Sequence, residues 1–276
     1  MPDAGSIALV VAGAAVAGFM NGLTGTGYAL SALGFWLHAV PPQVAAPLVA
    51  LCAVGGHAQA LPRMAASMDW PRLRPFLIAG LIGVPLGVAL LDRISAQPLK
   101  LTVGALLLVY VGWTAMVRTP PVVRGGGRIA DAAIGFGGGF LGGLASISGP
   151  LPIVWAQLRG WGKDEQRGIT QPYNMAILAF VLVAAAVGGL LDLSFLFWAA
   201  IALPISMLGT RAGLAVYARL SDSGFRRIVL AFLAVSGLVL IGTSIRALEA
   251  DPGLVQDRGQ PGRVLRGGVL ALQFGK

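Results

Sequence analysis

An all-α, polytopic membrane protein is the fold class that the sequence predicts, on three observations. The 276 residues are 56% hydrophobic and only 11% charged, whereas a soluble domain carries roughly 25% charged residues. The apolar residues are gathered into long runs, and a pattern of five such runs occurs twice. So few charges cannot solvate a globule of this size, so we expect lipid to surround most of its surface.

Ten apolar segments occur along the chain, at residues 5–24, 28–40, 44–62, 71–91, 98–117, 129–145, 150–159, 168–190, 194–217 and 226–245. A membrane span needs about 20 residues, so the second and seventh segments are too short to cross. Each of these two follows a longer segment across a small polar break, at 24–27 and 146–150. This pattern indicates a broken or re-entrant helical hairpin, which a membrane tolerates only where protein or water covers the backbone.

The two groups of five segments share residues as well as length. A glycine-rich stretch at 18–23 matches 139–144, Gly83 and Gly87 match Gly209 and Gly213, and R-I-S-x-x-x-L-K at 93–100 matches R-L-S-x-x-x-F-R at 219–226. Five is an odd number, so the two copies are predicted to be inverted repeats, a recurring feature of secondary transporters. We expect a first repeat at 1–117, a cytoplasmic loop at 118–128, a second repeat at 129–248, and a mostly disordered tail at 249–276.

The basic residues fit this topology. If consecutive segments alternate sides, twelve Lys and Arg residues of the loops fall on one side, and the other side has only Arg93 and Lys100 outside the tail. Such a bias is typical of cytoplasmic loops. The net charge of +9 therefore does not predict nucleic-acid binding, because the basic residues stand singly between apolar runs.

Several kinds of chemistry are excluded by the residues that the chain lacks. Cys52 is the only cysteine, so an intrachain disulfide and a multi-cysteine metal site cannot form. There is no G-x-x-x-x-G-K-[ST] motif for ATP. The spans show no nucleophile–base set, so an enzyme is disfavoured, and no cofactor or metal is expected. All eleven acidic residues lie at segment ends, in loops or in the tail, so the sequence predicts no buried carboxylate.

The duplicated glycine-rich hairpin, followed by G-x-x-x-G and R-[IL]-S-x-x-x-[LF]-[KR], resembles the TauE/SafE family over residues 5–245. The motifs are at 18–27 and 139–149, and at 83–100 and 209–226. The resemblance implies a secondary transporter of the bacterial inner membrane that moves sulfite, sulfoacetate or a related organosulfonate. A passive anion channel, or a carrier of another small organic anion, is the alternative.

The candidate substrate-binding residues lie mainly at the two breaks. If the repeats are inverted, the helices that begin near Tyr28 and Leu151 would meet with their N-termini, which attract anions, near the membrane centre. Hydroxyls from the breaks would then contact the anion, and glycines would let it approach the backbone. The candidates here are Asn21, Thr24, Gly25, Thr26, Gly27, Ser146, Ser148 and Gly149. The alternative interpretation is that these small residues only break and pack the helices.

Further candidates follow the second hairpin or lie within other spans. Gln171, Tyr173 and Asn174 surround Pro172, whereas the matching stretch 45–49 of the first copy keeps the proline and loses the polar residues. Arg211 is predicted to lie about 12 Å deeper than Arg219, where it would either bind the anion or extend to the headgroups.

His57 is a candidate proton relay, with a helix–helix hydrogen bond as the alternative role. Protons would then be the coupling ion. The expected partners are therefore the anion, the lipid bilayer and the coupling proton, and the interpretation allows a homo-oligomer.

Overall fold

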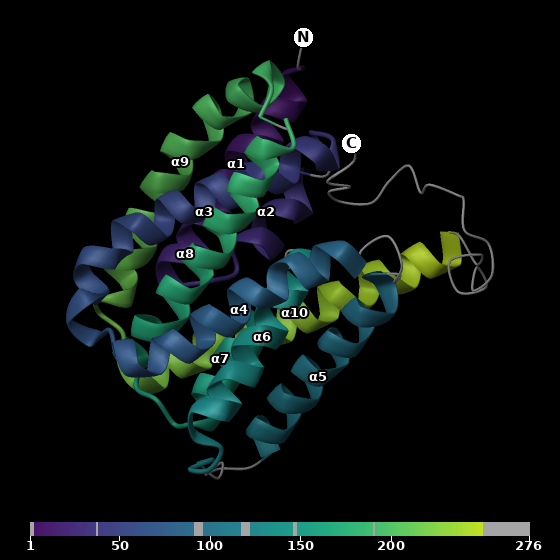
Figure 1. Ribbon diagram of the computed structural model, residues 1–276. Helices are drawn as coiled ribbons and strands as arrows, with labels where there is room; N and C mark the ends of the chain where they lie inside the picture. The colour runs from purple at the N-terminus through teal and green to yellow at the C-terminus, as the bar shows by residue number, and fades with distance from the viewer. Residues whose placement is uncertain are drawn as a thin grey trace.

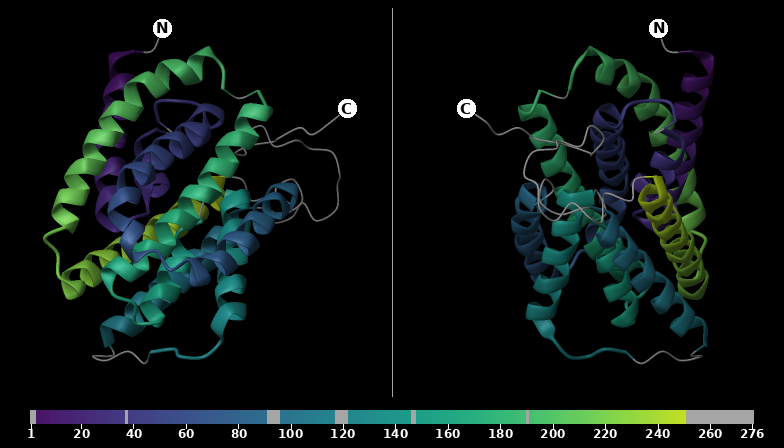
Figure 2. Two further views of the ribbon diagram at one scale, coloured as in Figure 1. Left: turned by 60° about the vertical axis from the view of Figure 1, so that its left-hand side comes forward. Right: turned by 90° about the vertical axis from the view of Figure 1, so that its right-hand side faces the viewer.

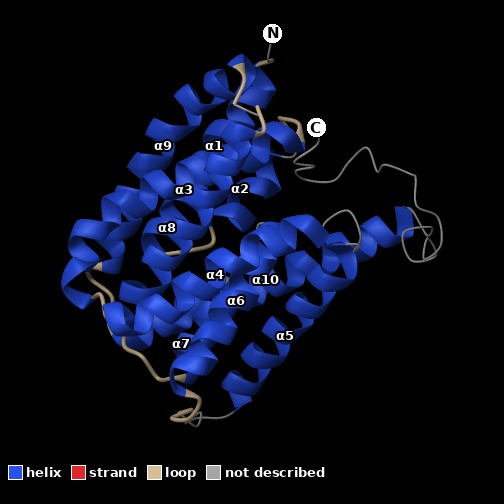
Figure 3. Ribbon diagram, viewed as in Figure 1, coloured by secondary structure: helices blue, strands red, loops and turns tan. Residues whose placement is uncertain are grey.

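The computed structural model describes residues 3–36, 38–90, 96–116, 122–145, 148–189 and 191–250. These residues form ten α-helices and one 3-10 turn, with no strand among them, which confirms the all-α prediction (Figures 1 and 3). The helices are α1 (Ala4–Thr24), α2 (Tyr28–Trp36), α3 (Pro42–Met64), α4 (Trp70–Leu90), α5 (Ala96–Met116), α6 (Gly127–Ala145), α7 (Pro150–Leu158), α8 (Lys163–Val187), α9 (Leu193–Tyr217) and α10 (Asp222–Ala250). Residues 251–276 of the predicted tail lie outside the described part of the chain, as do Arg93 and Ser146.

Five of the described helices are long and apolar enough to cross a membrane. They are α1, the part of α3 at Val44–Pro62, α8, α9 and the part of α10 at Asp222–Ile245. The two short segments of the sequence are the nine-residue helices α2 and α7. Nine residues extend about 14 Å, roughly half the thickness of the hydrocarbon layer. Each of these helices therefore ends within the membrane or at one surface.

The helices pack mainly in pairs. α1 lies along α9, α4 along α6, and α5 along α10 (Figures 1 and 2). α3 and α8 contact each other, and they also connect two of the pairs, since α3 packs on α1 and α9 while α8 packs on α4 and α6. The two breaks, which follow α1 and α6, lie beside α8, because a Cβ atom on Gly25 would lie 3.0 Å from Cγ of Gln171 and Ser148 is hydrogen-bonded to Asn174.

Glycines bring the helices of two pairs into backbone contact. A Cβ atom on Gly18 or Gly22 of α1 would lie 2.3 or 2.2 Å from a backbone oxygen of α9. A Cβ atom on Gly139 or Gly143 of α6 would lie 2.0 or 2.2 Å from a backbone oxygen of α4. Small residues allow such close approach of membrane helices. These four glycines are matched by the duplication in the sequence, so the matched residues have the same packing role.

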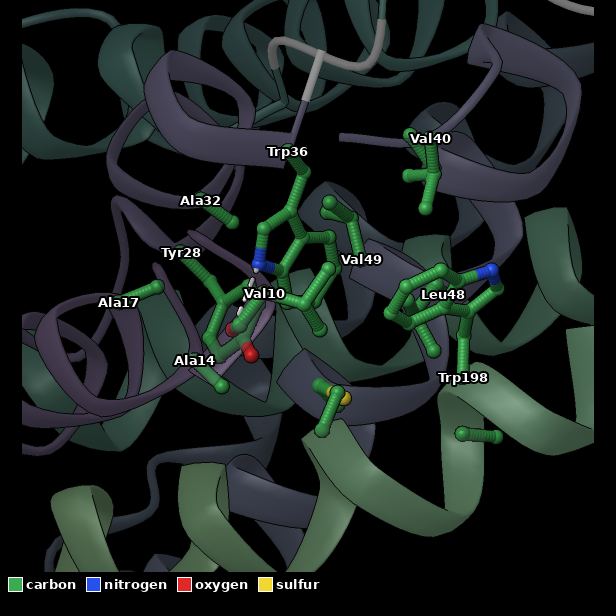
Figure 4. Packing of buried hydrophobic residues seen from close by; sticks show 14 of the residues in the cluster. Val10, Ala14, Ala17, Tyr28, Ala32, Trp36, Val40, Leu48, Val49 and Trp198 are labelled. Atoms are coloured by element: carbon green, nitrogen blue, oxygen red, sulfur yellow. Dashed lines mark hydrogen bonds between the residues drawn. The ribbon is translucent and has the colours of Figure 1, made fainter. Parts of the chain in front are cut away.

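The short helix α2 is fixed by an apolar cluster shown in Figure 4. Trp36 at its end has no exposed surface, and its indole Nε1 donates a hydrogen bond to the carbonyl oxygen of Val10 at 3.0 Å. The ring of Tyr28 meets that of Trp36 edge-on at a centroid distance of 6.0 Å. Because residues of α1, α3 and α9 complete the cluster, α2 cannot swing freely about the break that precedes it.

Helix α8 begins five residues before the apolar segment predicted at 168–190. Gly162 precedes it with extended backbone, and Asp164 and Glu165 occupy its first turn, where carboxylates interact favourably with the helix dipole. Hydropathy detects only the apolar part of a helix, so it does not predict this polar first turn. In the structure Arg167 therefore lies inside a helix and not in the preceding loop.

Several contacts hold the loops between helices together at one end of the molecule. Arg72 of α4 forms an ion pair with Glu165 of α8. The backbone N–H of Lys163 donates to Asp222 of α10 at 3.1 Å, and Arg159 donates to a carbonyl of the α5–α6 connection at 3.0 Å. The connections that carry the predicted basic bias therefore lie together, as expected if successive segments alternate sides.

We expect the Asp192→Ala substitution to lower the free energy of unfolding by about 1 kcal/mol, the usual contribution of an N-cap side chain. Asp192 precedes α9, and its carboxylate accepts a hydrogen bond from the backbone N–H of Phe195 at 2.8 Å. Unfolding in detergent with increasing denaturant would measure the change. Asp192→Asn is the control, because an Asn side chain retains the acceptor; equal stability of the Ala variant and wild type would contradict the assignment.

Candidate functional site

Buried polar side chains are concentrated where the two breaks meet α8. Such residues are costly inside a membrane protein and commonly mark its ion or substrate pathway. The set comprises Asn21, Thr24, Thr26, His57, Ser148, Gln166, Arg167, Thr170, Gln171, Asn174 and Thr210, each less than one tenth exposed. It draws on α1, α3, α8, α9 and both breaks, and we call it the polar centre.

The first break is a defined turn rather than a loose loop. Gly25 ends α1 with φ 77°, and Gly27 precedes α2 with φ 85°, both in the left-handed region that suits glycine. The hydroxyl of Thr24 lies 2.8 Å from the carbonyl oxygens of Met20 and Thr26. Since that hydroxyl is engaged in the turn, Thr24 holds the break in shape.

The second break lies directly against the first. A Cβ atom on Gly149 would lie 2.2 Å from Oγ1 of Thr26, so the helices α2 and α7 begin next to each other. The hydroxyl of Ser148 donates to Oδ1 of Asn174 at 3.1 Å, which ties this break to α8. Pro150 and Pro152 have no N–H, so the first turn of α2 supplies more free backbone donors than that of α7.

Arg167 supplies the charge of the polar centre. The side chain has no exposed surface. Its Nη1 donates to the carbonyl oxygens of Gly22 and Leu23 at 2.8 and 3.4 Å, and its Nε donates to Oε1 of Gln171 at 3.3 Å. The carbonyls belong to the C-terminal end of α1, the negative end of a helix dipole, which compensates part of the cost of burying a cation.

Four buried donors on α8 have no partner among the described residues: Nε2 of Gln166, Nη2 of Arg167, Nε2 of Gln171 and Nδ2 of Asn174. The last three residues are spaced four and then three apart, so they form a row along one face of the helix. The amide oxygens of Gln171 and Asn174 already accept hydrogen bonds from Arg167 and Ser148, which fixes the orientation of both amides. The unpaired groups of this row are therefore all hydrogen-bond donors, and an anion is the ligand that would satisfy them.

Asn21 and His57 form the other side of the polar centre. Neither polar atom of the Asn21 side chain has a partner among the described residues. A Cβ atom on Gly56 would lie 2.4 Å from Asn21 Nδ2 and 2.9 Å from Thr210 Oγ1, so the glycine of α3 leaves room for both. His57 follows Gly56, is 2% exposed, and has an unpaired Nδ1.

Two sequence candidates have polar groups that bond elsewhere in the protein. Arg211 is exposed, and its Nε donates to Gln59 at 3.2 Å, so the structure gives no support to a ligand role for it. The hydroxyl of Tyr173 donates to the carbonyl of Gly135 at 2.7 Å, and its ring meets Phe76 edge-on at 6.2 Å. Tyr173 therefore joins α8 to α4 and α6.

The prediction that no carboxylate is buried is wrong for Asp131. This residue of α6 is 3% exposed, and its Oδ1 accepts a hydrogen bond from the indole of Trp155 at 2.8 Å. It lies near the start of its apolar segment, and Trp155 of α7 packs over it. Sequence position alone could not show this, because the covering residue comes from another helix. No group of three His, Cys, Asp or Glu side chains that could hold a metal occurs among the described residues.

A cavity of about 390 Å³ lies between α1, α2 and α10. Most of its lining side chains are apolar, among them Met20 and Phe232. The ring of Phe232 also packs against the first break, where a Cβ atom on Gly27 would lie 2.2 Å from it. Phe232 therefore separates this cavity from the break.

Long apolar helices arranged around a buried polar centre define a multi-pass membrane protein. The profile of the family described as sulfite exporter TauE/SafE matches residues 10–240, and the chain belongs to this family. It is therefore a membrane transporter and not an enzyme. The probable sulfite/organosulfonate exporter TauE of Cupriavidus necator is 28% identical over 253 residues, covering 90% of this chain and 96% of the relative. No solved structure matches the chain significantly.

Proposed function

We propose that the protein is a secondary transporter that carries a small anion, namely sulfite, sulfoacetate or a related organosulfonate, through the polar centre by alternating access. The row of three unpaired donors on α8 carries this proposal. A sulfite or sulfonate group has three acceptor oxygens and can occupy several donors at once. The Cupriavidus necator relative, a probable sulfite/organosulfonate exporter, supports the same class of substrate.

In the proposed site Arg167, Gln171 and Asn174 hold the anion, with Thr26, Ser148 and Asn21 beside it. Gly25, Gly27 and Gly149 let an oxyanion approach the backbone at the breaks, and the first turn of α2 adds N–H groups. Thr24 and Tyr173 shape the site without binding, since their hydroxyls are engaged within the protein. Arg211 has no place in it.

We further propose that the halves are inverted repeats. The α1–α9 contact corresponds to the α6–α4 contact under the duplication, and the matched glycines make equivalent close approaches in both. The indole of Trp36 in α2 donates to residue 10 of α1, and that of Trp155 in α7 donates to residue 131 of α6. Positions 10 and 131 differ by 121, the offset of the first sequence match. Rocking one repeat against the other would expose the junction alternately.

The proposed location is a bacterial inner membrane, with the basic end facing the cytoplasm. The charge bias of the loops supports this orientation. Protons are the proposed coupling ion, and His57 is the candidate that carries them, since it is buried in the polar centre and has an unpaired Nδ1. A change of flux with an imposed pH gradient, lost in His57→Gln, would support this role.

Flux into proteoliposomes tests the proposal. We expect saturable uptake of sulfite or sulfoacetate that is accelerated by the same anion on the opposite side, as alternating access requires. Currents of single channels, or uptake that never saturates, would favour the passive channel. Absence of flux for both anions under every gradient would remove this substrate class.

The Asn174→Leu substitution should raise KM for the transported anion by roughly tenfold or more, the effect of losing a hydrogen bond to a charged group. Initial rates at increasing anion concentration would measure it. Ser244→Ala is the control: Ser244 has no exposed surface and an unpaired hydroxyl, but it lies on α10 outside the polar centre. An unchanged KM in Asn174→Leu would remove Asn174 from the site.

A further inference from the structure

Tyr217, at the end of α9, connects the buried Arg167 to the solvent-exposed end of α8. The guanidinium carbon of Arg167 lies 4.0 Å from the centre of the Tyr217 ring. The Tyr217 hydroxyl donates to Oδ1 of Asp164 at 2.5 Å. Asp164 is exposed, Tyr217 is 5% exposed, and Arg167 has no exposed surface. These three side chains therefore form one path from the aqueous end to the polar centre.

The Tyr217 ring covers Arg167 on this path. The Nη1 of Arg167 is held by the last carbonyls of α1. The guanidinium also lies against the Tyr217 ring, which Phe225 of α10 supports edge-on at a centroid distance of 5.5 Å. Lys163, one turn closer to the end of the helix, also lies against this ring at 5.0 Å. The Tyr217 side chain thus contacts Arg167 in the polar centre and also Lys163 and Asp164 nearer the basic end.

We propose that Tyr217 is the positioning residue that closes the anion site toward the basic end, and that Asp164 keeps it closed through the hydrogen bond. This inference rests on the proposed function, because it concerns the same site. Tyr217 touches the binding residue and lies outside the row of donors. The hydrogen bond from a neutral phenol to a carboxylate is charge-assisted, and it joins α9 to the first turn of α8.

The contact with the ring also links closure to occupancy. A guanidinium is attracted to the face of an aromatic ring by its positive charge. An anion at Nη2 compensates that charge, so the attraction between Arg167 and Tyr217 weakens when the site is loaded. A ligand that changes the relative free energies of two states shifts their populations. Tyr217 therefore separates from Arg167 more easily when the anion is bound.

Labelling of an engineered cysteine tests the closure without requiring transport. The background is Cys52→Ser, and the reporter is Thr170→Cys, on a buried position of α8 one turn beyond Arg167. An anionic, membrane-impermeant methanethiosulfonate is added to either face of sealed vesicles. We expect Tyr217→Phe, which keeps the ring and removes the hydrogen bond, to raise the labelling rate from the basic end roughly tenfold, as the loss of a charge-assisted hydrogen bond implies.

Asp164→Ala should give the same increase, and the double variant should match either single one, because the two residues act as a pair. Tyr173→Phe is the matched control, since it also removes a hydrogen-bonded tyrosine hydroxyl, which here donates to the Gly135 carbonyl at another helix contact. Unchanged labelling in Tyr217→Phe, additive effects in the double variant, or equal labelling in Tyr173→Phe would overturn the proposal. If labelling changes as expected but neither anion is transported, the closure stands and the substrate assignment fails.

Discussion

Arg167→Gln should reduce kcat/KM for the transported anion by about a hundredfold or more, the scale expected when one partner of a buried charge pair is removed. Arg167 is fully buried and presents an unpaired Nη2. A glutamine has no charge to offset the cost of moving an anion into the membrane. Initial rates of sulfite and sulfoacetate uptake, normalised to the amount of inserted protein, would measure the loss.

Arg211→Gln is the matched control, because it makes the same change at an exposed arginine. We expect it to transport at nearly the wild-type rate. Arg167→Lys should recover only part of the activity, since an ammonium cannot bond the α1 carbonyls and Gln171 and also present a further planar donor. Wild-type rates in Arg167→Gln with losses in Arg211→Gln would remove Arg167 from the site and make Arg211 the anion ligand, one of the two roles that the sequence left open for it.

The choice between these two arginines illustrates what a sequence of this kind can show. Arg211 lies in the middle of an apolar run, whereas Arg167 lies just before the apolar run at 168–190, where hydropathy indicates a loop. Hydropathy ranks depth along one segment, but burial depends on the neighbouring helices. The spacing of Arg167, Gln171 and Asn174 along one helical face is the signal that could have identified it.

Other features followed from the sequence because they are local or repeated. Every predicted apolar segment contains a helix, although the helix of segment 28–40 ends at Trp36 and residues 38–40 form a turn. Runs of this length and composition allow little else in a membrane. The breaks were visible as small and polar residues between apolar runs. Their contact through Gly149 and Thr26 depends on how the halves pack. The burial of Asp131 under Trp155 has the same origin.

Gly139→Ala should destabilise the protein by at least 1–3 kcal/mol, the range for overpacking a close contact, and lower the yield of folded protein. The added methyl group would lie 2.0 Å from the carbonyl oxygen of Gly80. Neither backbone can yield locally, so α4 and α6 must separate along their contact. Thermal unfolding in detergent, followed by the loss of monodisperse protein, would measure the effect.

Gly242→Ala on α10 is the control. Among the described residues, no atom outside the local backbone of α10 lies within 4 Å of the position of its added Cβ. Alanine favours a helix over glycine by up to about 1 kcal/mol, so this variant should equal or exceed the wild type in stability. Gly18→Ala should behave like Gly139→Ala, because its Cβ would lie 2.3 Å from the carbonyl oxygen of Ser206. Tolerance at both Gly18 and Gly139 would contradict the close packing of the two pairs. If only one of the two substitutions is tolerated, the two helix pairs differ in how tightly they pack, and so in how firmly each break is held against α8.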